Sequence, residues 1–183
     1  MSRTTTPSPL PPNAAANAMA GTRLIGELEE LLAQLTDEHL KLFAQVDAHA
    51  TAMRQLDLRA MDKTRRQQEA CRSRVNTLEH RRRAVVRQLA RLHGLPGEPK
   101  VPVLAELYPA RRAALMASRQ ALREAIGEVG SRNRVATGLA RSVLGHLNAA
   151  VRAFARAVDR PGTYTRDGLP RLADRIGVME AVG

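Results

Sequence analysis

Two histidines, His39 and His49, have the spacing in this chain that comes nearest to metal chemistry. They lie ten residues apart on one apolar stripe of a predicted helix, so a bound metal would need further ligands from a partner helix. Polar positions within a helical interface are the simpler interpretation, because apolar seams often carry a few polar side chains. We therefore expect no metal site and no other cofactor.

The motifs that mark catalysis are absent from the sequence. It has no glycine-rich phosphate loop, no His-Glu-x-x-His, and no serine or cysteine nucleophile beside a base. Cys71 is the one cysteine, so it forms no internal disulfide and cannot make a zinc site alone. The position of Cys71 in the apolar repeat suggests a small buried residue. A chain without disulfides fits a reducing compartment. The sequence predicts a protein that is not an enzyme and takes no small-molecule substrate.

A basic run, "EHRRRAVVRQLAR", raises the possibility of nucleic-acid binding, as does a formal net charge of +11. Bases stack on aromatic side chains, but the chain has two Phe, two Tyr and no Trp, and none of them interrupts this run. Only three of the 29 basic residues are lysine. Arginine thus dominates the whole chain, which is as typical of a compositional bias as of a binding surface, and we do not expect nucleic acid to be a partner.

The amino end, "MSRTTTPSPLPPNAAANAMAG", contains four prolines and lacks the continuous apolar core of a signal peptide. We expect residues 1–21 to form a disordered tail. No window approaches the roughly 18 charge-free apolar residues of a membrane-spanning helix. The sequence therefore predicts a cytoplasmic protein without membrane insertion.

Apolar residues repeat in alternating steps of three and four from Thr22 onward, which predicts a helix over 22–56. This seam comprises Leu28, Leu32, Leu35, His39, Leu42, Val46, His49, Met53 and Leu56. After Asp57 the stripe resumes one residue over, which turns it by about 100°. We therefore predict a break there, with Asp57 capping a second helix over 57–93. A single kinked helix is the alternative.

The sequence "HGLPGEPKVP" ends the second helix and predicts a linker over 94–108, with a short helical turn in "VLAELY". Pro109 suits the first turn of a third helix, 109–159, which "RPG" ends before a short tail, 161–183. The predicted fold is all-α, an elongated antiparallel three-helix bundle or coiled coil in one domain, 22–160. Asn133 on the third seam is interpreted as a register-setting amide.

Charge indicates how these helices pair. Residues 22–56 hold three basic and six acidic groups, a net charge of −3, whereas residues 57–93 hold eleven and four, a net charge of +7. Residues 103–160 hold ten basic and four acidic groups, a net charge of +6. We expect the acidic first helix to lie against both basic helices.

The third helix is predicted to be longer than the other two, so its end should extend past them. Four seam residues there would lack an internal partner: Leu147, Val151, Phe154 and Val158. An uncovered apolar stripe is typical of an interface, and we predict that these residues bind a partner. A folded-back tail, a bend at the helix glycines and self-association are the alternatives.

The order and spacing of several segments resemble the FlgN-type flagellar export chaperones over residues 22–168. The segments are "LLAQLTDEHLKLF", the junction "LDLRAMDK" followed by "LEHRRRAVV", the final helix "NRVATGLARSVLGHLNAAV", and "TYTRDG". The strong positive charge and the proline-rich amino tail depart from the family pattern. The alternative class is a basic coiled-coil structural or nucleic-acid-associated protein.

The resemblance implies a cytoplasmic protein of the flagellar type III export system. Such a chaperone holds hook–filament junction (hook-associated) subunits by their disordered or helical C-terminal segments and docks at the cytoplasmic domain of the export gate. The tail tyrosine of the family is implicated in gate docking, and Tyr164 is the matching position. The alternative is that Tyr164 folds back over Phe154 and Val158. The sequence does not specify which junction subunit is bound or the oligomeric state.

Overall fold

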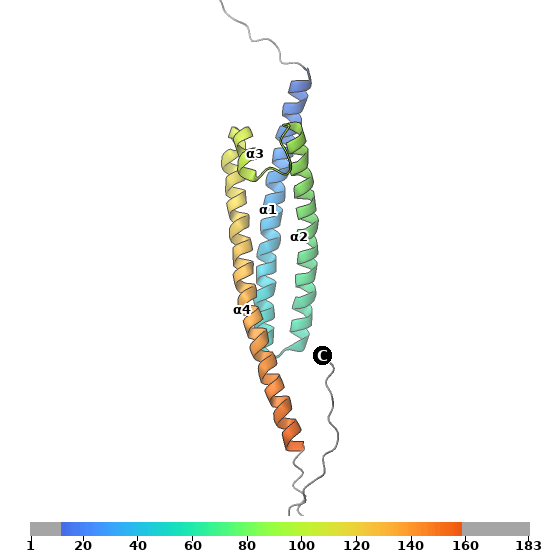
Figure 1. Ribbon diagram of the computed structural model, residues 1–183, viewed down its shortest axis with the longest axis vertical. Coiled ribbons are helices and arrows are strands. Elements are labelled where there is room, and N and C mark those ends of the chain that lie inside the picture. The colour runs from blue at the N-terminus through green and yellow to red at the C-terminus, as the bar shows by residue number, and fades with distance from the viewer. Residues whose placement is uncertain (1–11, 159–183) are drawn as a thin grey trace, which may run out of the picture. The chain divides into compact units, whose positions relative to one another are not determined.

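A computed structural model describes the backbone of residues 12–158 and the side chains of residues 16–156. It contains α1 (Pro12–Gln55), α2 (Leu58–Leu92), α3 (Val101–Leu107), the 3-10 turn η1 (Pro109–Arg111) and α4 (Arg112–Val158) (Figure 1). No strand occurs between residues 12 and 158, and the predicted all-α class is confirmed. The chain divides into two compact units at residues 139 and 140, within α4, and each unit is described by itself.

The predicted break between α1 and α2 is confirmed, and a single kinked helix is excluded. Leu56 adopts a left-handed conformation, with φ at 53°. Its amide donates to the Met53 carbonyl at 3.2 Å, and the Asp57 amide donates to the Ala52 carbonyl at 3.0 Å. These two bonds satisfy carbonyls at the end of α1 in the Schellman pattern. The Asp57 carboxylate then accepts from the Ala60 amide at 3.0 Å and caps α2, as predicted.

α2 ends in the same geometry with a residue better suited to it. Gly94 has φ at 64°, its amide donates to the Arg91 carbonyl at 3.3 Å, and the Leu95 amide donates to the Ala90 carbonyl at 2.8 Å. Glycine adopts positive φ without steric cost. The predicted linker follows, and the short helical turn expected within it is α3.

The first unit is built on the apolar face of α1, which lies between α2 and the first part of α4 (Figure 1). The larger of its two apolar clusters combines residues of α1, α2, α3 and α4: Leu24, Ile25, Leu28, Leu31, Leu32, Leu35, Val85, Val86, Leu89, Leu104, Ala105, Leu115 and Leu122. A second cluster joins α1, α2 and α4 through Leu42, Val46, Cys71 and Val129. The expected burial of Cys71 is confirmed.

Ion pairs confirm that the acidic first helix lies against both basic helices. From α2, Arg74 pairs with Glu38 at 2.7 Å and Arg81 pairs with Glu27 at 2.8 Å. Two further pairs reach α1 from beyond the linker. Arg111 in η1 contacts Glu29 at 3.1 Å, and Arg132 in α4 contacts Asp47 at 3.3 Å.

Tyr108 packs the linker against α1 and α2 at one end of this unit. Tyr108 donates to or accepts from His93 Nε2 at 2.7 Å, and the two rings meet edge to face. The Tyr108 hydroxyl lies against Gly21 of α1 so closely that a β-carbon there would overlap it. Gly21 thus permits the linker to pack directly on the helix backbone.

The predicted start of the first helix is wrong. The sequence predicted a tail over residues 1–21 and a helix from Thr22, whereas α1 begins at Pro12. Proline is tolerated in the first turn of a helix, and residues 13–20 contain five alanines, the strongest helix formers. The prolines outweighed this alanine content in the prediction. Residues 1–11 and the predicted tail 161–183 lie outside the described residues, and α4 ends at Val158.

The two helix ends give a stability prediction. Leu56→Gly should raise the free energy of unfolding by about 0.5–1 kcal/mol, because the left-handed cost for leucine exceeds the extra unfolded-state entropy of glycine. Gly94→Ala should lower it by about 1 kcal/mol for the converse reason. Urea unfolding followed by circular dichroism measures both. A lower stability for Leu56→Gly would show that the exposed Leu56 side chain contributes more than its backbone costs.

Candidate partner-binding site

The distal part of α4 carries large apolar side chains in water. Leu144 is 59% exposed, Leu147 50%, Val151 65% and Phe154 74%. Every residue from Leu144 to Arg156 is exposed. Contiguous exposed apolar surface is uncommon on soluble proteins and marks interaction sites. We call these four residues the distal stripe.

The distal stripe continues the heptad pattern that forms the core earlier in the same helix. Leu115, Leu122 and Val129 lie on this pattern and are buried, at 0%, 8% and 6% exposure. The spacing of the apolar residues does not change along α4, since steps of three and four persist from Val129 to Val158. One sequence pattern therefore encodes a buried face in the first part of α4 and an exposed face in the second.

Three of the five predicted binding residues belong to this exposed face, namely Leu147, Val151 and Phe154. Val158 ends α4, but its side chain lies outside the described residues, as does all of Tyr164. Leu144 was not among the predicted residues, because its neighbour Val143, four residues before Leu147, falls on the heptad seam instead, and Val143 is half-buried. The signal for Leu144 was its position three residues before Leu147, which puts both on one helical face.

The two histidines take the role of polar positions in the interface. His49 Nδ1 lies 2.8 Å from the Thr64 hydroxyl across α1 and α2. His39 Nδ1 is buried without a hydrogen-bond partner, and burial lowers the pKa of this imidazole against the opposing charge of Glu79. Among residues 12–158, no three His, Cys, Asp or Glu side chains gather as metal ligands would. Asn133, on the seam of α4, is half-buried.

α1 also carries a buried carboxylate, that of Glu38. Burial alone would raise the pKa of Glu38, but hydrogen bonds from Lys41 Nζ and Arg74 Nε, both at 2.7 Å, hold the pKa below its usual value. Arg74 also donates to the Cys71 sulfur at 3.1 Å. These groups satisfy one another, so they are interpreted as structural.

The basic run is largely neutralised within the protein. Arg81 binds Glu27 through two nitrogens, at 2.9 and 2.8 Å, and Arg87 contacts Glu98 at 3.0 Å. Arg82 and Arg83 both contact Glu79, at 2.9 and 3.9 Å. Arginines held by carboxylates are poorly disposed to neutralise phosphates. This pairing counts against the run as a nucleic-acid surface.

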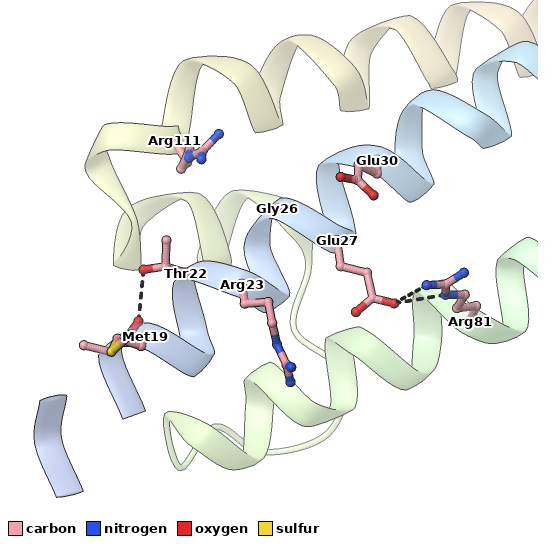
Figure 2. Close-up of a pocket in the computed structure, with 9 residues that line it drawn as sticks. Met19, Thr22, Arg23, Gly26, Glu27, Glu30, Arg81 and Arg111 are labelled. Atoms are coloured by element: carbon pink, nitrogen blue, oxygen red, sulfur yellow. Dashed lines mark hydrogen bonds and ion pairs between the residues drawn. The ribbon is translucent and has the colours of Figure 1, made fainter. Parts of the chain in front are cut away.

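A shallow groove lies beside the amino-terminal part of α1, with a volume of about 780 Å³. Figure 2 shows that Arg81 reaches Glu27 across it and that Arg23, Glu30 and Arg111 also border it. Its charges alternate in sign, and Gly26 supplies no side chain. Ala18 and Met19 add some apolar surface to the groove. The groove therefore presents no uniform charge, and the distal stripe, with four large exposed apolar side chains, is the stronger candidate site.

Comparison with known proteins identifies one family. A family model described as FlgN protein matches residues 19–171, which is most of the 183-residue chain. No curated protein and no solved structure matches the chain. The matched range includes all of α2 and α4, and it begins within α1. Between residues 12 and 158, each helix is too short or too polar to cross a membrane.

Exposure of the distal stripe predicts that charge is tolerated there and not in the core. The double variant Val151→Asp/Phe154→Asp should change the free energy of unfolding by no more than about 1 kcal/mol. Leu35→Asp and Leu42→Asp should each cost about 3 kcal/mol or more, because a carboxylate would be buried without a partner. Thermal melts followed by circular dichroism decide this. A distal variant that melts as early as the core variants would place Val151 and Phe154 in a core.

Proposed function

Because this chain belongs to the FlgN family of flagellar export chaperones, we propose that it binds hook–filament junction subunits and delivers them to the export gate. The proposal places it in the cytoplasm, as a component of flagellar type III export. The cargo segments that it binds would be the disordered or helical C-terminal segments of hook-associated proteins. Its second partner would be the cytoplasmic domain of the gate.

The distal stripe is the observation that carries this proposal. A junction subunit awaiting export has ends that bury their apolar residues only on assembly, so they are prone to aggregate until then. A helical surface with an exposed apolar face can cover such a segment in the manner of helix-in-groove recognition. Leu147, Val151 and Phe154 supply that face, and we propose that Val158 extends it by one helical turn.

The structure also supports different roles for the first unit, which forms the core, and the distal stripe, which binds the partner. In the first unit, the apolar face of α1 is already occupied by α2, α3 and the first part of α4. The distal stripe, by contrast, is exposed while its backbone is held in a continuous helix. A preformed helix binds with a smaller loss of conformational entropy than a disordered segment would. The fold thus makes the stripe available without any rearrangement of the core.

Tyr164 is proposed as the residue that docks at the gate. It lies six residues beyond the end of α4, outside the described residues. Support comes from its match to the family tyrosine and from the chemistry of the side chain. Tyrosine fills pockets at small entropic cost and keeps a hydrogen bond through its hydroxyl, so it is enriched at binding hot spots.

Cargo binding should depend on the distal stripe. Val151→Asp/Phe154→Asp should weaken binding of a junction subunit at least about 30-fold, since buried hot-spot residues contribute 2 kcal/mol or more. The matched control is Leu40→Asp/Leu58→Asp, which changes two apolar side chains that are 52% and 76% exposed elsewhere. It should leave affinity within about twofold. Isothermal titration calorimetry with a purified hook-associated protein measures both. Equal losses in the two variants would contradict a site on α4.

Gate docking should depend on Tyr164 and not on the distal stripe. Tyr164→Ala should weaken binding to the cytoplasmic domain of the gate about tenfold or more, because a pocket-filling ring is lost. Cargo affinity and melting temperature should stay at their unmodified values. Titration of the variant against both partners, with a melt of the chain alone, tests this. Unchanged gate affinity, or a lowered melting temperature, would show that Tyr164 packs on the chaperone instead.

A further inference from the structure

No side chain of residues 16–156 covers the distal stripe. Leu147, Val151 and Phe154 are 50%, 65% and 74% exposed, although the same repeat is buried earlier in α4. These three residues lie within about 60° of the helix circumference, so they form one narrow apolar face. Faces of this kind are usually covered by a partner. A helix that carries the same repeat would be a suitable cover.

The chain itself contains a segment with that repeat beyond α4. Residues 169–182 lie outside the described residues, and their sequence places Leu172, Ile176 and Met179 at steps of four and three. In a helix these three residues would fall within about 60° of one another. Pro170 suits the first turn of such a helix. The sequence therefore predicts a second amphipathic helix after the end of α4, and we call residues 169–182 the tail segment.

The apolar faces of α4 and of the tail segment have matching lengths. In each, the outer two residues are seven positions apart, which is about two helical turns, and the third residue lies between them. An antiparallel helix pair would therefore bring the two faces together in three layers: Phe154 with Leu172, Val151 with Ile176, and Leu147 with Met179. Apolar seams of helices are buried against each other in such layers.

The sequence between the two faces permits the chain to turn back. Pro161 and Gly162 disfavour continuation of α4, and Asp167-Gly168 is a turn signal. The ten residues of 159–168 separate α4 from the tail segment. Connections between neighbouring helices usually take about two to eight residues. The connection is therefore long enough for an antiparallel return.

We infer that the tail segment folds back as a helix on the distal stripe and covers it until cargo displaces it. This inference rests on the function proposed above and adds the regulation of its binding site. A segment tethered by a short linker has an effective concentration of about 1 mM, so a weak contact suffices to close the site. A helix of this length is marginal in water by itself. The contact therefore opens readily, and cargo can replace it.

Charge favours the tail segment over a second copy of distal α4. Between Glu128 and Asp159 the sequence contains no acidic residue, so two copies of distal α4 would bring only positive charges together. The tail segment has two acidic and two basic residues and therefore no net charge. Its contact with α4 would depend on apolar burial without like-charge repulsion. The match to the family model ends at residue 171, so most of the tail segment lies beyond the matched range.

Hydrogen–deuterium exchange of the full chain, without a partner, tests whether the stripe is covered. Leu172→Asp/Ile176→Asp puts charge into the apolar face of the tail segment and should accelerate exchange over residues 144–156 about tenfold, because the cover opens. The matched control, Val178→Asp/Ala181→Asp, changes the net charge equally at positions at least about 100° from every residue of that face. It should leave exchange within about twofold. Equal exchange in the unmodified chain and both variants would overturn the inference.

Cargo affinity measures the competition. If the tail segment closes about nine molecules in ten, its removal from the stripe should strengthen binding of a purified hook-associated protein about tenfold, because only the open fraction binds. Leu172→Asp/Ile176→Asp should show this gain, by the same factor as the faster exchange, and the control variant should not. Equal gains in both variants would show a general charge effect and overturn the inference. A loss of affinity would show that the tail segment helps to hold cargo, which would also overturn it.

Other outcomes separate this inference from the proposed function. Failure of every junction subunit to bind, with the exchange result intact, would overturn the function while the contact between the tail segment and α4 stands. Cargo binding that depends on Phe154, with no effect of Leu172→Asp/Ile176→Asp on exchange or affinity, would leave the function and overturn the inference. A dimer in sedimentation equilibrium that the same variant dissociates would show that the tail segment covers a second copy, which would overturn it too.

Discussion

The structure depends on the apolar face of α1, because α2, α3 and the first part of α4 all pack on it. Ile25, Leu28 and Leu35 on this face are fully buried against α2, α3 and the first part of α4. Burying each such side chain is worth about 1.5–3 kcal/mol, so the helix is held mainly by burial. The four ion pairs that α2, η1 and α4 make with α1 add direction to this packing.

Once α1 is covered in this way, the remaining apolar residues of the α4 repeat stay exposed. The repeat that buries Leu115 and Val129 exposes Val151 and Phe154, although the sequence spacing is the same. A surface of this kind would be a liability in a protein with no partner. In a member of a flagellar chaperone family, we propose that the same surface covers a segment of a flagellar subunit.

Much of this fold could be predicted because its determinants are local. The one-residue shift of the apolar stripe and the Asp57 cap predicted the break between α1 and α2, and segment charges predicted their pairing. The predicted start of α1 was wrong. A proline is tolerated in the first turn of a helix, as Pro12 is here, although it disrupts a helix elsewhere. The left-handed Leu56 could not be foreseen, since leucine rarely adopts that conformation. Leu144 was missed because heptad counting chooses one of two adjacent apolar residues.

Hydrogen–deuterium exchange of the chaperone, alone and with a purified hook-associated protein, tests the central claim most directly. Amides in exposed helices exchange quickly through local opening, and a bound partner slows them. The account predicts slower exchange over residues 140–158 on binding, with little change in α1 and α2. Slowing confined to α1 and α2, with residues 140–158 unchanged, would contradict it.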